Sequence, residues 1–135
     1  MNIGESFYCS RCLAEIGDEY ICPRCGYNPN SPADEDALEE GTTLMCMRFH
    51  IGAVRRKLKG GYIYGAFDYV KQKPVYIFEY FPELGLSREV ESGSRVIVPH
   101  GKESAFKDGM NKLKAGLSAR HEAFSENNTL YVFRP

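Results

Sequence analysis

Four cysteines near the N-terminus have the spacing that points most directly to chemistry. They form two Cys-x-x-Cys pairs, Cys9 with Cys12 and Cys22 with Cys25, and nine residues separate the pairs. Two residues between paired cysteines let both sulfurs reach one tetrahedral ion at about 2.3 Å. Gly26 follows the second pair, where the backbone often needs positive φ. The pattern therefore predicts one zinc ion bound by all four cysteines.

Four thiolates would fill the coordination sphere of such an ion, so no position would remain for water or a substrate. We therefore expect a structural ion rather than a catalytic one. Two disulfides, or iron in place of zinc, are the alternatives, and paired cysteines in a reducing compartment more often ligate metal. Because so short a segment has no core of its own, metal binding and folding should be one event, contributing about 10–16 kcal/mol.

Other chemically capable side chains stand alone in the sequence. Cys46 lies in an expected strand without a neighbouring histidine, which favours buried packing over a nucleophile's role. The three histidines, His50, His100 and His121, form no i, i+4 pair. Glu79 is a single carboxylate without a partner, so it makes no acid/base pair, and we expect it to face solvent from a strand.

Composition limits the classes of protein that fit. The chain has 135 residues, of which 43% are hydrophobic, enough for one main globular domain. Its 17 basic and 18 acidic residues give a net charge of −1, so the whole molecule has no field that attracts nucleic acid or anionic membrane. No run approaches the roughly 20 apolar residues of a membrane span, and residues 1–10 do not resemble a signal peptide. We expect a cytoplasmic protein.

Three zones differ in composition. Residues 1–28 contain the four paired cysteines and form the expected zinc ribbon, residues 29–41 are rich in proline and acid and indicate a solvated linker, and residues 42–135 must contain the core. In the third zone we expect strands over 45–56, 62–68, 75–81 and 95–98, and a hairpin of 122–125 with 129–133 around a turn at 126–128. An apolar stripe predicts one main helix and consists of Phe106, Met110, Leu113 and Leu117. The order predicts an α+β fold with a mainly antiparallel sheet.

Several segments together resemble a known family. They are Cys-Pro-Arg-Cys-Gly-Tyr-Asn-Pro (22–29), Leu-Glu-Glu-Gly-Thr (38–42), residues 64–68, Val-Tyr-Ile-Phe-Glu-Tyr-Phe-Pro (75–82), Phe-Lys-Asp-Gly-Met (106–110) and Asn-Asn-Thr-Leu-Tyr-Val (127–132). The chain resembles bacterial Ser/Thr protein kinases of the eukaryotic-like type that carry an N-terminal zinc ribbon before the kinase N-lobe. The resemblance spans nearly the whole chain and ends where a kinase would enter its hinge. It implies a small zinc ribbon followed by a kinase N-lobe-like antiparallel sheet with one main helix.

Departures from this family's pattern bear on activity. The alanine that roofs the adenine is replaced by Tyr76, and the phosphate-binding lysine is replaced by Phe78. Only Gly61 remains of the glycine-rich loop, which aligns with residues 56–61, and the helix glutamate falls near Gly116. His-Arg-Asp and Asp-Phe-Gly sequences are absent. The resemblance thus implies a degenerate, pseudokinase-like N-lobe that neither binds ATP nor transfers phosphate.

The strand over 75–81 suggests where such a protein would bind partners. Tyr76, Phe78 and Tyr80 alternate with Val75, Ile77, Glu79 and Phe81, so they emerge on one side of the sheet. By the resemblance, this side looks into the nucleotide cleft. Several exposed aromatic rings make a patch of the kind that marks interfaces. We therefore expect a contact surface for a protein partner or for a second copy of the chain.

Three other functions remain open. The chain can be a fragment of a longer pseudokinase. A basic cluster at residues 55–59, together with Arg11 and Arg24, can make a nucleic-acid-binding adaptor if these groups share a face, although a solvated turn explains the cluster more simply. A deep pocket with convergent ionisable groups would favour an enzyme. The acidic runs at 34–36 and 39–40 fit a solvated linker better than a docking motif.

Overall fold

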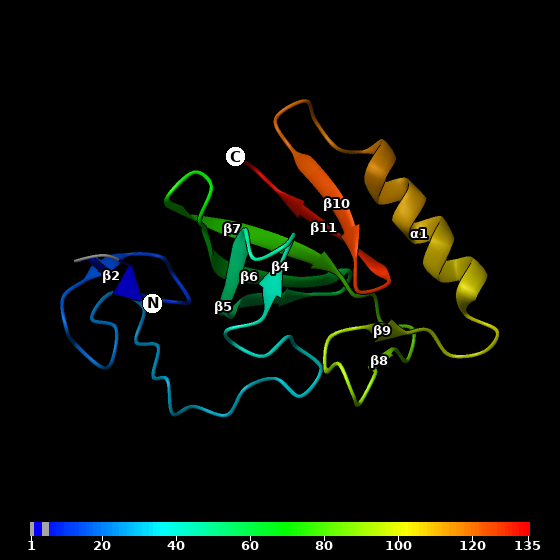
Figure 1. Ribbon diagram of the computed structural model, residues 1–135. Helices are drawn as coiled ribbons and strands as arrows, with labels where there is room; N and C mark the ends of the chain where they lie inside the picture. The colour runs from blue at the N-terminus through cyan, green and yellow to red at the C-terminus, as the bar shows by residue number, and fades with distance from the viewer. Residues whose placement is uncertain (1, 4–5) are drawn as a thin grey trace.

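A computed structural model describes residues 2–3 and 6–135, with a six-stranded antiparallel sheet at its centre (Figure 1). The strand order is β10-β11-β7-β6-β5-β4. The strands are β4 (Thr43–Leu44), β5 (Phe49–Leu58), β6 (Gly61–Asp68), β7 (Lys73–Tyr80), β10 (Glu122–Glu126) and β11 (Thr129–Phe133). One helix, α1 (Glu103–Ala115), lies between β7 and β10 in the sequence. The coarse expectation of an α+β fold with a mainly antiparallel sheet is confirmed.

Two smaller sheets accompany the central one. The short strands β8 (Ser87–Arg88) and β9 (Val96–Ile97) pair with each other after β7. The N-terminal region has β1 (Asn2–Ile3), β2 (Ser6–Tyr8) and β3 (Glu15–Ile16), which form a three-stranded sheet beside the cysteines. The expected strand over 95–98 thus exists, although it is only two residues long. In the described part of the chain, no helix is both long enough and apolar enough to cross a membrane.

The C-terminal hairpin follows the predicted turn chemistry. Asn127 and Asn128 have φ values of 53° and 59°, and they connect β10 and β11. Asparagine tolerates this left-handed conformation better than most residues. The helix is also where the apolar stripe placed it, except that it ends at Ala115, so Leu117 lies beyond it.

The expected start of the first long strand is wrong. Met45, Cys46 and Met47 all have positive φ, between 51° and 71°, and form a tight turn. Thr43–Leu44 pairs with Phe49–His50, so the chain must reverse direction between them. Alternating apolar residues had indicated a strand, but Met45 and Met47 are exposed at this turn. Cys46 is exposed as well, which corrects the expectation that it packs in the core.

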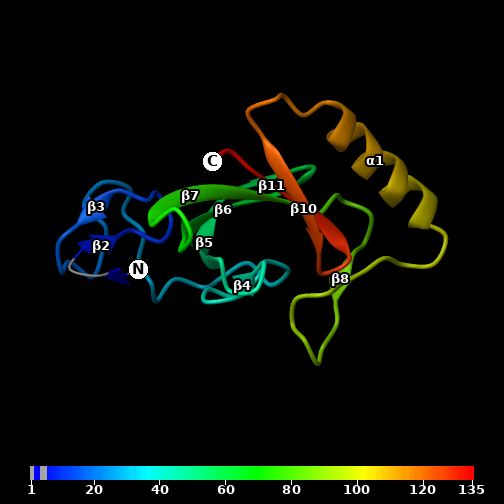
Figure 2. The same ribbon diagram turned by 45° about the horizontal axis from the view of Figure 1, so that its top comes forward.

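One face of the sheet carries the main core. This core face consists of Tyr62, Tyr64, Ile77, Tyr131 and Phe133, each at most 3% exposed. Segments before and after the long strands cover it, contributing Ala37, Leu38, Leu44, Leu86 and Val96 to the same cluster. Figures 1 and 2 show these covering segments on one side of the sheet and α1 on the other.

The expected linker therefore packs in part against the sheet. Leu38 is 4% exposed, and its backbone N–H donates to the Tyr64 hydroxyl at 2.9 Å. Asp34 accepts a hydrogen bond from the Tyr62 hydroxyl at 2.9 Å. The acidic residues 34–36 are exposed, as expected for a solvated segment, but Ala37 and Leu38 are buried against the core face.

Glu79 projects from β7 into this core, where the sequence had suggested a solvent-facing position. Its carboxylate is 0% exposed and accepts hydrogen bonds from the hydroxyls of Tyr64 at 2.8 Å and Tyr131 at 2.7 Å. Arg88 donates two further bonds, at 2.6 and 3.0 Å. Register explains the burial, since Glu79 lies opposite Tyr62 on β6 and Tyr131 on β11.

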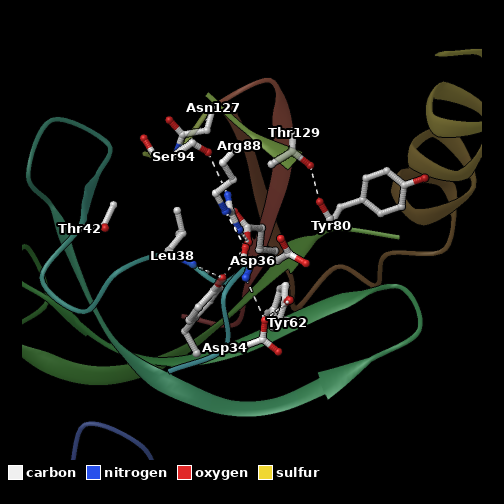
Figure 3. Close-up of polar contacts among 12 residues, drawn as sticks. Asp34, Asp36, Leu38, Thr42, Tyr62, Tyr80, Arg88, Ser94, Asn127 and Thr129 are labelled. Atoms are coloured by element: carbon white, nitrogen blue, oxygen red, sulfur yellow. Dashed lines mark hydrogen bonds and ion pairs between the residues drawn. The ribbon is translucent and has the colours of Figure 1, made fainter. Parts of the chain in front are cut away.

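Arg88 extends this network to the covering segments. Its guanidinium also donates to the backbone carbonyls of Asp36 at 2.7 Å and Ser94 at 2.9 Å (Figure 3). Burial alone would lower the pKa of Arg88, but the hydrogen bonds that it donates to Glu79 raise this pKa above its ordinary value. Burial, with the Glu79 charge next, raises the pKa of both Tyr64 and Tyr131. The tyrosines therefore remain neutral and donate their hydroxyl protons to the Glu79 side chain.

The first prediction concerns this ion pair. Arg88→Ala should lower the free energy of unfolding by about 3–5 kcal/mol, because it leaves the Glu79 carboxylate buried without its cation. Urea unfolding followed by circular dichroism measures the change.

Arg95→Ala is the matched control, since Arg95 pairs with Glu89 at 3.7 Å but is 57% exposed. An exposed pair contributes less than about 1 kcal/mol. Equal losses in the two variants would show that the Glu79–Arg88 pair does not stabilise the fold.

Candidate metal centre

The four predicted ligand cysteines lie together in the structure. Their sulfur atoms are all within 4.8 Å of one another, with Cys9 3.6 Å from Cys25 and Cys12 3.7 Å from Cys22. A tetrahedral ion about 2.3 Å from each sulfur would place neighbouring sulfurs about 3.8 Å apart. The cluster could hold one metal ion. The chemistry of four thiolate donors fits zinc, whose identity stays a prediction.

Two tight turns position these sulfurs. In the first, the Leu13 N–H donates to the Cys9 carbonyl at 2.9 Å and Leu13 takes φ 63°. In the second, the Gly26 N–H donates to the Cys22 carbonyl at 2.9 Å, and Gly26 takes φ 77°. Gly26 thus has the positive φ that the sequence predicted. Each turn folds its two sulfurs to the same side.

Backbone N–H groups point at the sulfurs within these turns. Cys12 donates to the Cys9 sulfur at 3.5 Å, while Arg24 and Cys25 donate to the Cys22 sulfur at 3.4 and 3.5 Å. Burial opposes ionisation of Cys22, but these two backbone bonds lower its pKa to about 7. Such bonds stabilise thiolates, the form in which cysteine binds metal.

The other three thiols behave differently. Burial raises the pKa of Cys9, Cys12 and Cys25 above the ordinary value. A bound cation would reverse this effect, because a metal deprotonates the thiols that coordinate it. Ionisation of these three cysteines therefore depends on the ion itself.

The segment holding the four cysteines, residues 6–28, packs on the sheet; we call it the cysteine module. The Ser10 carbonyl accepts a hydrogen bond from Ala53 of β5 at 2.9 Å. It sits in a notch between two glycines: a Cβ on Gly52 would lie 2.6 Å from the Ser10 oxygen, and a Cβ on Gly65 would lie closer still. Only glycine permits so close an approach at both positions. The Tyr76 hydroxyl adds a bond to the Cys12 carbonyl at 2.6 Å.

The module covers one end of the sheet face opposite the core. This helix face consists of Ile63, Gly65, Tyr76, Phe78 and Tyr80, which the register of β6 and β7 places together. Its other end lies under α1, and Figures 1 and 2 show the module and the helix at opposite ends of the sheet. One face of one sheet thus supports both the metal-binding segment and the helix.

The predicted contact surface is split by this arrangement. Tyr80 is 6% exposed and donates its hydroxyl to the Phe106 carbonyl of α1 at 2.8 Å, so it is not available at the surface. Phe78 is half-buried, and Tyr76 is 40% exposed. The three rings emerge on one side, as expected, but the helix crosses the Tyr80 end. Alternation in the sequence indicates which side of the strand a residue faces, but it does not indicate which other segment covers that side.

Tyr76 and Phe78 line a shallow hollow on this face, with a volume of about 420 Å³. Its other walls come from β6, from the end of α1 and from the C-terminal strand, and they are Ile63, Leu113, Leu117, His121, Val132, Phe133 and Arg134. Most of this lining is apolar. The hollow is the part of the predicted surface that remains open.

Positions singled out for other functions are dispersed. Arg24 and Arg55 line one hollow beside Cys12 and Cys25, so the structure brings together part of the basic cluster. His50 packs on Tyr69 with ring centroids 4.5 Å apart, and His121 lies 2.8 Å from the Ser118 hydroxyl. The described residues therefore contain no grouping of histidine with Cys46 or Glu79. Glycines within strands, such as Gly52 and Gly65, are the sequence signal that another backbone approaches closely, as the Ser10 backbone does here.

Comparison with known proteins gives a likeness in fold alone. No protein-family model matches the chain, and no curated protein matches it. A solved structure described as "PpkA-294 apo form", a bacterial Ser/Thr kinase fragment, is similar with a TM-score of 0.60 and 21% sequence identity. The similarity covers 73% of this chain and 38% of that one. The covered 73% of this chain thus shares the fold of part of that structure, in agreement with the coarse resemblance seen in the sequence.

Proposed function

We propose that this chain is a non-catalytic interaction or regulatory protein, in which a zinc-bound module and a degenerate kinase N-lobe-like sheet form one binding platform. The observation that carries the proposal is the nature of Tyr76 and Phe78. By the resemblance they occupy the adenine-roof and phosphate-lysine positions, and in the structure they line an open apolar hollow.

The chemistry of that hollow supports binding over phosphoryl transfer. Transfer of a phosphoryl group depends on cations and positioned metal ions that stabilise charge. Phe78 brings a ring where a lysine charge is needed. The described lining contains no carboxylate to hold magnesium, and its ionisable side chains are Tyr76, His121 and Arg134. An apolar surface of this kind suits contact with another protein.

A longer pseudokinase is a second form of the same proposal. The structural likeness covers 38% of the kinase fragment, so the activity and partners of that protein are not assumed for this chain. Either form places the binding surface on the helix face. The proposed setting is a reducing cytoplasm, in which the four thiols stay available to zinc.

A nucleic-acid-binding adaptor is the competing function, and one observation favours it. Arg24 and Arg55 line the same hollow, although they come from the module and the sheet. Cys12 and Cys25 line it too, however, and a divalent ion held by four thiolates leaves two net negative charges beside them. The two guanidiniums then mainly offset the metal centre, and little positive potential remains for phosphate.

The second prediction concerns the metal. Purified protein should contain close to one zinc per chain, as four thiolates satisfy one tetrahedral ion. Cys22→Ser should lose the ion together with the order of residues 6–28, while β5, β6 and β7 stay folded. Elemental analysis and amide hydrogen exchange measure both effects.

Cys46→Ser serves as the control, because Cys46 is exposed and is not part of the cysteine cluster. It should keep its zinc. Iron in the purified protein, or equal metal loss in both variants, would contradict the assignment.

The third prediction is that ATP with magnesium does not bind. Titration calorimetry should give a dissociation constant weaker than about 1 mM, because the rings of Tyr76 and Phe78 cannot neutralise phosphate. A low-micromolar constant would refute the alignment of this chain with the kinase nucleotide site.

The fourth prediction tests the binding platform itself. Phe78→Glu should weaken self-association or partner binding at least about tenfold, since a charge in an apolar contact costs more than about 1.4 kcal/mol. Sedimentation velocity and quantitative mass spectrometry of co-purified proteins measure this loss.

Val70→Glu adds the same charge in the β6–β7 turn, where Val70 is 65% exposed, and it should leave binding intact. Both variants should keep their circular dichroism spectrum and zinc content. Unfolding of Phe78→Glu would instead assign Phe78 to the core and place the interface elsewhere.

A further inference from the structure

The cysteine module has a second hollow, separate from the one lined by Tyr76 and Phe78. Its volume is about 240 Å³. Apolar and aromatic side chains supply most of its walls, namely Phe7, Tyr8, Ile16, Tyr20, Tyr27 and Pro29. Tyr20 is 59% exposed and Phe7 is 39% exposed, while the adjacent Ile21 is 52% exposed. So many large apolar groups open to solvent on one short segment are typical of a contact surface.

The charged side chains that line this hollow, Asp18 and Glu19, are both acidic. None of the described lining residues is basic. Neither carboxylate takes part in an ion pair within the described part of the chain. Arg24 and Arg55 lie beside Cys12 and Cys25 and offset the charge of a four-thiolate ion, so the two carboxylates supply the negative charge at this hollow.

Two metal ligands form part of the same wall. Cys9 and Cys22 line the hollow, and they are 2% and 3% exposed. The shape of the hollow therefore depends on the order that the metal imposes on both cysteine turns. Loss of an ion would therefore disturb this surface.

We propose that this hollow is a metal-dependent docking site for a protein segment that presents one large apolar side chain flanked by lysine or arginine. Size sets the apolar part, because 240 Å³ is about eight times the ~30 Å³ that a water molecule occupies in the liquid. That volume is enough for a single large side chain. Charge complementarity predicts the residues that flank this side chain in the partner, because Asp18 and Glu19 would attract lysine or arginine.

The site deepens the proposed function and rests on it, because it supplies the chemistry of one partner of an interaction protein. The same charges argue against other macromolecules. Nucleic acid and anionic lipid surfaces both present phosphate, which the two carboxylates repel. A basic peptide, in contrast, would be attracted by the two carboxylates.

The experiment uses the zinc-loaded full chain and fluorescein-labelled decapeptides, with fluorescence anisotropy as the readout. The probe alternates leucine with arginine, one control peptide alternates leucine with glutamate, and another alternates serine with arginine. Only the leucine–arginine peptide should bind, with a dissociation constant on the order of 0.1 mM, as expected for a small contact area. Chelation of zinc should abolish binding while the circular dichroism of the sheet persists.

Variants locate the site on the module. Asp18→Lys with Glu19→Lys, and separately Tyr20→Ser, should each weaken binding at least about tenfold, as truncation of central contacts does. Glu83→Lys with Glu91→Lys makes the same change of charge at exposed positions elsewhere and should bind as the unaltered chain does. Phe78→Glu should also bind normally, so failure at this hollow and failure at the hollow lined by Tyr76 and Phe78 are separate results.

Several outcomes overturn the proposal. Equal binding of the serine–arginine peptide would reduce the contact to charge alone, and binding after chelation would remove the metal from it. Tighter binding of an oligothymidylate of ten nucleotides would favour nucleic acid instead. If Tyr20→Ser loses zinc, Tyr20 is structural, and the doubly substituted Asp18 and Glu19 variant, whose sites are exposed, then decides the question.

Discussion

A carboxylate placed in an apolar core must find partners, and this constraint organises most of the central domain. Glu79 reaches the tyrosine hydroxyls of β6 and β11 and the guanidinium of Arg88, which in turn bonds the backbone of residues 36 and 94. Two covering segments, one before the sheet and one after β7, are thereby fixed to the same point. A buried, hydrogen-bonded ion pair fixes the relative positions of the segments it connects more specifically than apolar packing alone does.

The opposite face of the sheet is divided between two unrelated supports. The helix takes the Tyr80 end, and the cysteine module takes the Tyr76 end through the notch formed by Gly52 and Gly65. Phe78 lies between them in the strand and is only half covered. Its ring lines the mostly apolar hollow between the two supports.

The sequence predicted features that depend on neighbours along the chain. The spacing of the cysteines brings Cys9, Cys12, Cys22 and Cys25 together because each pair closes its own turn, and Asn127–Asn128 makes its hairpin for similarly local reasons. The stripe from Phe106 to Leu113 located α1. Register between distant strands was not readable, so the burial of Glu79 next to Tyr64 and Tyr131 was missed. The turn at Met45–Met47 was missed because pairing of β4 with β5 overrides local alternation.

The glycine notch under Ser10 links the sheet to the metal affinity of the cysteine module. The hydrogen bonds of the module with Ala53 and Tyr76 form only when the cysteine turns are folded, and a bound ion would stabilise those turns. By thermodynamic linkage, the free energy of docking would then add to the free energy of metal binding. The same 23 residues, cut from the sheet, would bind an ion less tightly than the docked module would. The sheet would thus raise the affinity of the cysteines for metal, although it supplies no ligand atom.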